Sequence, residues 1–87
     1  MNMKEQMKIK TRRQAELISD PICLSIINFI EEESYTIKEI ANNLEEDYSI
    51  IKKYMKELCD NNLFVQIEED GETKYIKSAK SYKMGSW

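Results

Sequence analysis

Histidine is absent from the 87-residue sequence, and cysteine occurs only at Cys23 and Cys59. Zinc coordination and proton transfer near neutral pH rely most often on histidine, and a structural zinc site needs about four ligands. Two distant cysteines cannot supply such a site, and the carboxylates occur in runs that are typical of solvated surfaces. The sequence therefore predicts no cofactor, no metal site and no enzymatic activity.

The two cysteines leave two interpretations open. Both fall within apolar patterns, where reduced thiols behave as small hydrophobic side chains. The alternative is a redox-sensing pair, which requires reactive thiolates. Burial as reduced thiols is the simpler of the two.

Glycine and proline are also scarce, with two residues and one residue. This scarcity argues against a flexible linker and a glycine-rich phosphate loop. No apolar run approaches the ~20 residues of a membrane span, and the segment Met1–Thr11 is basic and polar, unlike a signal peptide. We therefore expect a cytoplasmic protein with no membrane partner, built as a single domain over residues 1–87. Disordered tails are expected at 1–11 and 80–87.

Neither sign of charge dominates, because the chain has 13 basic and 16 acidic residues and a net charge of −3. The charge is banded. Residues 1–13, 48–58 and 73–87 carry net charges of +4, +2 and +4, whereas 14–47 and 59–72 carry −8 and −5. The distribution matters more than the sum for a nucleic-acid-binding protein, and three basic bands can converge on one face of a fold.

The first half of the chain predicts two helices. A short helix covers residues 12–19, and Asp20-Pro21 then provides an N-cap and a proline at the first helical position. The second helix is expected over residues 22–32. Its inward face is expected to hold Leu24, Ile27 and Ile30, widened by Ile26 and Phe29.

Two further helices follow. Thr36 and Glu39 form a capping box for a helix over residues 37–44. After a turn at Glu45-Glu46, Asp47 or Ser49 caps a fourth helix that runs to about Asp60. Its inward face is expected to hold Ile51, Tyr54, Met55 and Leu58.

The pattern then changes to alternating apolar residues. Residues 63–67 and 73–77 predict two strands, joined by an acidic turn in which Asp70-Gly71 is a strong hairpin signal. Asn61-Asn62 ends the preceding helix, since asparagine tolerates the left-handed conformation. The fold class is thus mostly α with a small β-hairpin, in the order of a winged helix-turn-helix.

This order predicts sequence-specific binding of double-stranded DNA by the fourth helix, about residues 48–60, in the major groove. The residues expected to contact DNA are Tyr48, Ser49, Ile50, Lys52, Lys53 and Lys56 on this helix and Lys74 and Lys77 on the second strand. Flanking contacts are expected from Lys8, Lys10, Arg12 and Arg13.

These motifs resemble the ArsR-like family of transcriptional regulators. The segment from Asp20-Pro21 to Ile27 is similar to the family's Asp-Pro-x-Arg-Leu-x-Ile-Leu. Residues 36–44 resemble its support helix, and residues 51–58 resemble its recognition helix, Val-x-x-His-Leu-Lys-x-Leu. The resemblance covers about residues 10–80 without gaps. It implies a transcriptional regulator that binds DNA, usually as a dimer. The N-terminal segment and Trp87 are candidate dimer surfaces, although a disordered tail is the simpler interpretation of Trp87.

The sequence also departs from the family pattern. Glu45-Glu46 stands where the family usually has glycine, and Tyr54 and Cys23 replace its histidine and arginine. Metal sensing does not carry over, since the clusters of cysteine and histidine are absent. The acidic turn of the hairpin weakens the expectation that it contacts phosphate.

The alternative interpretation is a protein-interaction module that does not bind DNA. Winged helices can bind proteins through the same face. Acidic residues from Glu31 to Asp47 and from Asp60 to Glu72 suit a basic protein partner.

Overall fold

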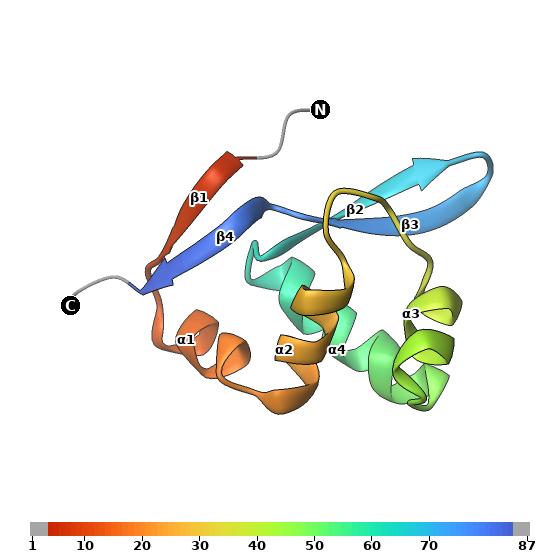
Figure 1. Ribbon diagram of the computed structural model, residues 1–87, viewed down its shortest axis with the longest axis horizontal. Coiled ribbons are helices and arrows are strands. Elements are labelled where there is room, and N and C mark those ends of the chain that lie inside the picture. Colours follow the sequence, from red (N-terminus) through yellow and green to blue (C-terminus); the bar gives the residue numbers. More distant parts are fainter. Residues whose placement is uncertain (1–3, 85–87) are drawn as a thin grey trace.

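The computed structural model describes residues 4–84, and this part of the chain forms four helices and four strands (Figure 1). In order they are β1 (Lys4–Ile9), α1 (Arg12–Ile18), α2 (Pro21–Phe29), α3 (Ile37–Leu44), α4 (Tyr48–Asp60), β2 (Phe64–Glu69), β3 (Glu72–Lys77) and β4 (Ala79–Met84). The β2–β3 hairpin extends from one end of the helical layer, and β1 and β4 lie together at the other end (Figure 1). The predicted winged helix-turn-helix arrangement is confirmed.

Capping residues define where the helices begin. Thr36 and Glu39 form the predicted capping box: the Thr36 Oγ1 accepts from the Glu39 N–H at 3.1 Å, and the Glu39 carboxylate accepts from the Thr36 N–H at 2.9 Å. Asp20 caps α2 as predicted. Thr11 and Gln14 form a second capping box at α1, which the sequence analysis missed. Each box satisfies N–H groups that a helix leaves unpaired.

The turn between α3 and α4 closes without glycine. Glu45 ends α3 in the left-handed conformation, with φ of 56°, where the ArsR-like pattern usually has glycine. A non-glycine residue is strained in this conformation. The Glu46 N–H donates to the Ala41 carbonyl at 3.0 Å, which stabilises the turn.

Helix α2 differs from the prediction in both its face and its end. Cys23 and Ile26 are fully buried, whereas Leu24, predicted to face inward, is 42% exposed. One residue corresponds to about 100° around a helix, so the buried stripe is rotated from the predicted one. The helix ends at Phe29, and the acidic residues 31–33 are not helical. The negative charges of residues 31–33 therefore lie beyond the helix, where they oppose its dipole less than they would within the last turn.

The hairpin confirms the predicted wing. Strands β2 and β3 pair antiparallel from Phe64 opposite Lys77 to Glu69 opposite Glu72. Asp70 and Gly71 join them with φ of 53° and 78°, as expected for a two-residue turn that matches the twist of the strands. Asn62 has φ of 63° just after α4, in agreement with its predicted role.

The prediction of disordered tails is wrong for most of both segments. β1 and β4 form a parallel two-stranded sheet in which Met7 lies opposite Tyr82 and Lys8 opposite Lys83. Ile9 is fully buried, so this ribbon is anchored in the core. Residues 1–3 and 85–87, including Trp87, lie outside the described residues.

One cluster of buried side chains holds the elements together. Ile51, Met55 and Leu58 of α4 have no exposed surface and belong to the same cluster as buried side chains of α2, α3 and β1. Three of the four residues on the predicted inward face are therefore confirmed as buried. Within residues 4–84, no helix has both the length and the apolar character needed to cross a bilayer.

Candidate nucleic-acid interface

Helix α4 has one side in the core and the other in solvent. The exposed side carries Tyr48, which is 53% exposed, together with Ser49, Ile50, Lys52 and Lys53. Neither Lys52 nor Lys53 forms an ion pair with a described residue. These five predicted site residues therefore lie together and are accessible to a ligand.

The start of α4 lacks a side-chain cap. Asp47 has the backbone conformation of an N-cap, but its side chain accepts no capping hydrogen bond, and Ser49 lies within the first turn instead of at the cap. The prediction of a side-chain cap from either residue is wrong. N–H groups at a helix start attract external acceptors, and the helix dipole adds to this attraction.

One hydrogen bond holds α4 against α2. The Tyr54 hydroxyl donates to the Asp20 carboxylate at 3.1 Å, and the same carboxylate caps α2. Burial is the larger cause that raises the pKa of Tyr54 above its usual value, and this hydrogen bond is the second cause. Asp20 thus links α2 to α4, a contact that was not predicted from the sequence.

Two predicted contact residues are already paired. The Lys56 Nζ lies 2.9 Å from the Asp60 Oδ2, one turn along α4. The Lys74 Nζ of β3 lies 3.2 Å from the Glu69 Oε1 of β2. In each case the hydrogen bond to the carboxylate raises the pKa of the lysine. Their charge is partly neutralised, although exposed ion pairs are weak and exchange readily.

The structure does not support Lys77 as a contact residue. It occupies an inward position of β3 and is only 8% exposed. Burial lowers the pKa of its ammonium group, and the nearby Glu31 partly opposes this shift. The alternating pattern of the strand places Lys77 on the same side as Tyr75, which also faces the core.

Replacing Lys77 with methionine is expected to raise the melting temperature near neutral pH. The buried ammonium is charged there in both folded and unfolded chains, and its desolvation opposes folding. Because its folded-state pKa is lowered, wild-type stability should increase as the pH rises through that value toward the unfolded value near 10.5. The Met variant should lack this alkaline increase in thermal melts. A lower melting temperature at neutral pH would show instead that attraction by the charge of Glu31 outweighs desolvation.

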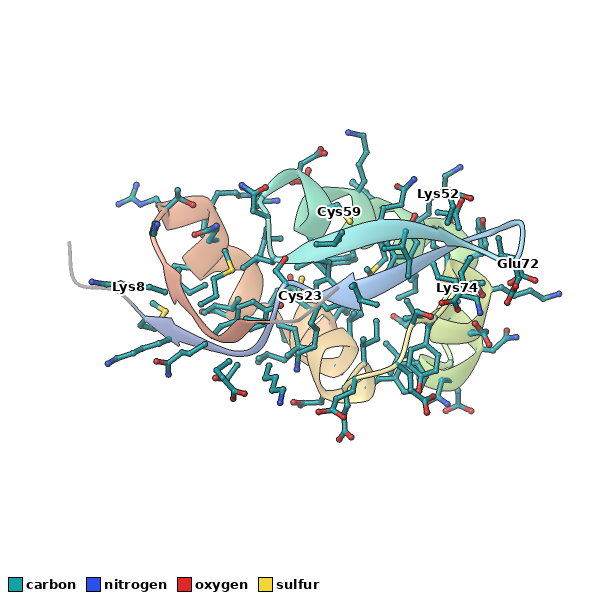
Figure 2. The ribbon with its side chains drawn as sticks, turned by 90° about the horizontal axis from the view of Figure 1, so that it is seen from above. Lys8, Cys23, Lys52, Cys59, Glu72 and Lys74 are labelled. Atoms are coloured by element: carbon teal, nitrogen blue, oxygen red, sulfur yellow. The ribbon has the colours of Figure 1, made fainter. Side chains whose placement is uncertain are left out.

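The predicted convergence of the basic bands does not occur. Lys8 lies at one end of the longest axis and Lys52 near the other (Figure 2). The molecule extends 39 Å along this axis. Arg13 pairs with Glu16 at 3.5 Å and with Glu57 at 3.3 Å. Lys8 therefore does not flank the exposed side of α4, whereas Arg13 lies beside Lys53 with its charge paired to Glu57.

A groove separates α4 from the wing. It has a volume of about 480 Å³, and a second hollow of about 580 Å³ adjoins it toward α3. Lys52, Gln66 and Tyr75 line both. Gln66, like Thr36, Lys38 and Thr73 in the second hollow, was not predicted as a site residue. Gln66 is exposed but lies opposite Tyr75 in the hairpin, so the two side chains share one face. Only the packing of the wing on α4 shows that Gln66 lies beside Lys52.

The two thiols are poorly suited to redox sensing. Cys23 is fully buried and Cys59 is half-buried, and both are free (Figure 2). Burial, reinforced by the charge of Asp20, raises the pKa of Cys23 to about 12, and burial raises the pKa of Cys59 to about 11. Since the thiolate is the reactive form, these values favour the interpretation of reduced, packed thiols.

Acidic side chains are exposed on both sides of the groove. Glu45 and Asp47 lie before α4, and Glu68, Asp70 and Glu72 lie at the tip of the wing. Within residues 4–84, the acidic and cysteine side chains do not gather into a metal-binding group.

Comparison with known proteins shows the fold. No known family model matches the sequence, and no curated protein is similar to it. Among solved structures, NolR from Sinorhizobium fredii superposes with a TM-score of 0.69 at 18% identity, covering 77% of this chain and 67% of that chain. HlyU from Vibrio cholerae superposes with a TM-score of 0.69 at 16% identity, covering 77% of this chain and 73% of that chain.

A third structure is described as a homodimeric winged helix-turn-helix DNA-binding domain, fragment 1–100, from Mycobacterium bovis, a possible ArsR-family transcriptional regulator. It superposes with a TM-score of 0.71 at 13% identity, covering 78% of this chain and 63% of that chain. At these identities the similarity shows the winged helix-turn-helix fold. The chain spans between 63% and 73% of the length of these three structures.

Proposed function

We propose that this chain is one cytoplasmic winged helix-turn-helix domain of the ArsR-like type, which binds double-stranded DNA and regulates transcription without enzymatic activity. The observation that carries the proposal is the arrangement of α4. Its apolar stripe is fully buried, whereas its other side presents two lysines that form no ion pair with residues 4–84, beside a helix start without a side-chain cap. A helix of this kind fits the major groove, which is about 12 Å wide.

The exposed site residues of α4 divide into three groups with different roles in this proposal. Tyr48, Ser49 and Ile50 on the first turn meet base edges, because the first turn of a recognition helix enters the groove most deeply. Lys52 and Lys53 bind guanine acceptors or phosphates. Lys56 binds phosphate after leaving Asp60, which positions the protein but does not read sequence.

Lys74 is a weaker candidate, since its side chain is only 20% exposed and pairs with Glu69. Lys77 is left out because it is buried. We also propose a homodimer, by analogy with the M. bovis domain, whose description names it homodimeric. Two copies would read half-sites about one helical turn apart.

The proposal is tested by titrating mixed-sequence duplex DNA with the full chain at low and moderate salt. The variant Lys52→Gln/Lys53→Gln is expected to bind on the order of tenfold or more weakly. The slope of log K against log salt should become less steep by about 1.8, since each lost phosphate contact contributes about 0.9.

The control is Lys80→Gln, which removes the charge of a cation that already pairs with Glu5 and lies on β4, away from α4. It should keep the wild-type salt dependence. Salt-sensitive binding that survives in the Lys52/Lys53 variant would contradict the role of α4. Circular dichroism of each variant shows whether it is folded.

A second candidate function is binding of a basic protein through the acidic surface. The exposed carboxylates at the wing tip and before α4 favour it. The same titration separates the two functions, because a folded sample that does not bind DNA at low salt would favour the protein partner.

A further inference from the structure

The ribbon of β1 and β4 presents a basic face of its own. In the parallel register Lys8 lies opposite Lys83, and Gln6 lies opposite Ser81, with all four side chains exposed. Met7 and Tyr82, one residue away, pack against the core. Side chains alternate between the faces of a strand, so these four share the outer face. We call Gln6, Lys8, Ser81 and Lys83 the ribbon face.

The two lysines of the ribbon face lack a compensating charge among the described residues. Glu5, the carboxylate nearest in the chain, lies at an alternate position and pairs with Lys80 at 3.3 Å. Lys80 also approaches Glu32 at 3.8 Å. Like charges directly opposite each other destabilise a sheet. An anion held between Lys8 and Lys83 would remove this repulsion.

The ribbon face and the exposed side of α4 lie on different parts of the molecule. Lys8 is at the opposite end of the long axis from Lys52, and the blue β4 strand runs along the long side opposite to α4 (Figure 2). The long axis extends 39 Å. A straight duplex seated on α4 therefore lies on the other side of the molecule from β4.

We propose that the ribbon face is a second phosphate-binding surface, which holds a duplex segment other than the one at α4, so that one domain bridges two segments of DNA. Paired lysines with a glutamine beside them are donors that bind phosphate oxygens without reading sequence, whereas the Ser81 hydroxyl already donates to the Glu5 carbonyl at 3.2 Å. Lys10 and Arg12, exposed just after β1, extend the positive charge. The bridging rests on the proposed function of α4, whereas phosphate binding by the ribbon face does not.

The test uses the full chain, one duplex fixed on beads and a second, fluorescent duplex in solution. The wild type should retain the second duplex on the beads, and retention should fall as salt rises. The variant Lys8→Gln/Lys83→Gln should still bind the fixed duplex within about twofold of wild type, but its retention of the second duplex should fall at least tenfold. The control Lys80→Gln removes a lysine of the same strand as Lys83 that already pairs with Glu5, and it should bridge as wild type does.

Three outcomes overturn the proposal. Unchanged retention in the Lys8/Lys83 variant would assign bridging to another surface, such as two α4 helices in a dimer. A wild type that binds the fixed duplex without retaining the second would leave the α4 proposal intact and remove this one. A sedimentation mass twice the 10.3 kDa chain mass that falls to one chain in the Lys8/Lys83 variant would identify the ribbon face as a dimer contact.

One further outcome separates the two proposals. If Lys52→Gln/Lys53→Gln leaves binding of the fixed duplex unchanged while Lys8→Gln/Lys83→Gln abolishes it, the assignment of α4 fails and the ribbon face is supported as a phosphate site.

Discussion

Replacing Leu58 with alanine is expected to lower the free energy of unfolding by about 2–5 kcal/mol. Leu58 has no exposed surface and lies on the buried stripe of α4 with Ile51 and Met55. It also lies where α4 turns toward the wing, since its carbonyl accepts from the Leu63 N–H at 2.9 Å. The substitution removes buried methyl groups and leaves a cavity that the rigid surroundings only partly fill. Small domains are stable by only about 5–15 kcal/mol, so this loss is a large fraction of the total.

Urea denaturation followed by far-UV circular dichroism measures this effect. Lys52→Ala is the matched control on the same helix, because its side chain is exposed and unpaired among the described residues, and it should change the unfolding free energy by no more than about 0.5 kcal/mol. Similar midpoints for the two variants would contradict the placement of Leu58 in the core.

Replacing Asp20 with alanine is expected to cost about 2–3 kcal/mol. One carboxylate has two roles, since it caps α2 through the Ile22 and Cys23 N–H groups and accepts from the Tyr54 hydroxyl. Loss of an N-cap typically costs about 1 kcal/mol, and loss of a hydrogen bond to a charged group about 1.5–3 kcal/mol. The lower end applies here because Asp20 is only half-buried.

A double-mutant cycle with Tyr54→Phe separates the two roles of Asp20. Tyr54→Phe alone should cost about 1 kcal/mol, and the two substitutions together should cost less than their sum, because they remove the same hydrogen bond. Additive effects would show that Tyr54 and Asp20 do not interact. Asp20→Asn is a second control, since asparagine also caps helices, and it should destabilise less than alanine.

Local signals in the sequence predicted most of the secondary structure. The capping box at Thr36 and Glu39 and the turn at Asp70-Gly71 act over a few residues, so both can be predicted without knowledge of the rest of the fold. Errors occurred where periodicity was ambiguous. In α2 nearly every residue is apolar, so the pattern did not identify Leu24 as exposed. The β1–β4 ribbon was missed because its two strands are polar and lie at opposite ends of the chain.

The candidate site was only partly predictable. The spacing of Ile51, Met55 and Leu58 identified the buried side of α4, and therefore the exposed side that carries Lys52 and Lys53. Whether a lysine is unpaired depends on which carboxylates lie nearby. Lys74 faces Glu69 across the hairpin, an ion pair that the sequence analysis did not predict.

By itself, the sequence determined the order of the elements from α1 to β3, the caps at Asp20 and Thr36 and the side of α4 that faces solvent, because each depends on interactions between residues close in the chain. Only the tertiary structure decided where the charges lie relative to one another. Folding buries Lys77 and places Lys8 and Lys52 near opposite ends of the molecule (Figure 2). Electrostatic contacts depend on distance in space, and distance along the chain does not determine it.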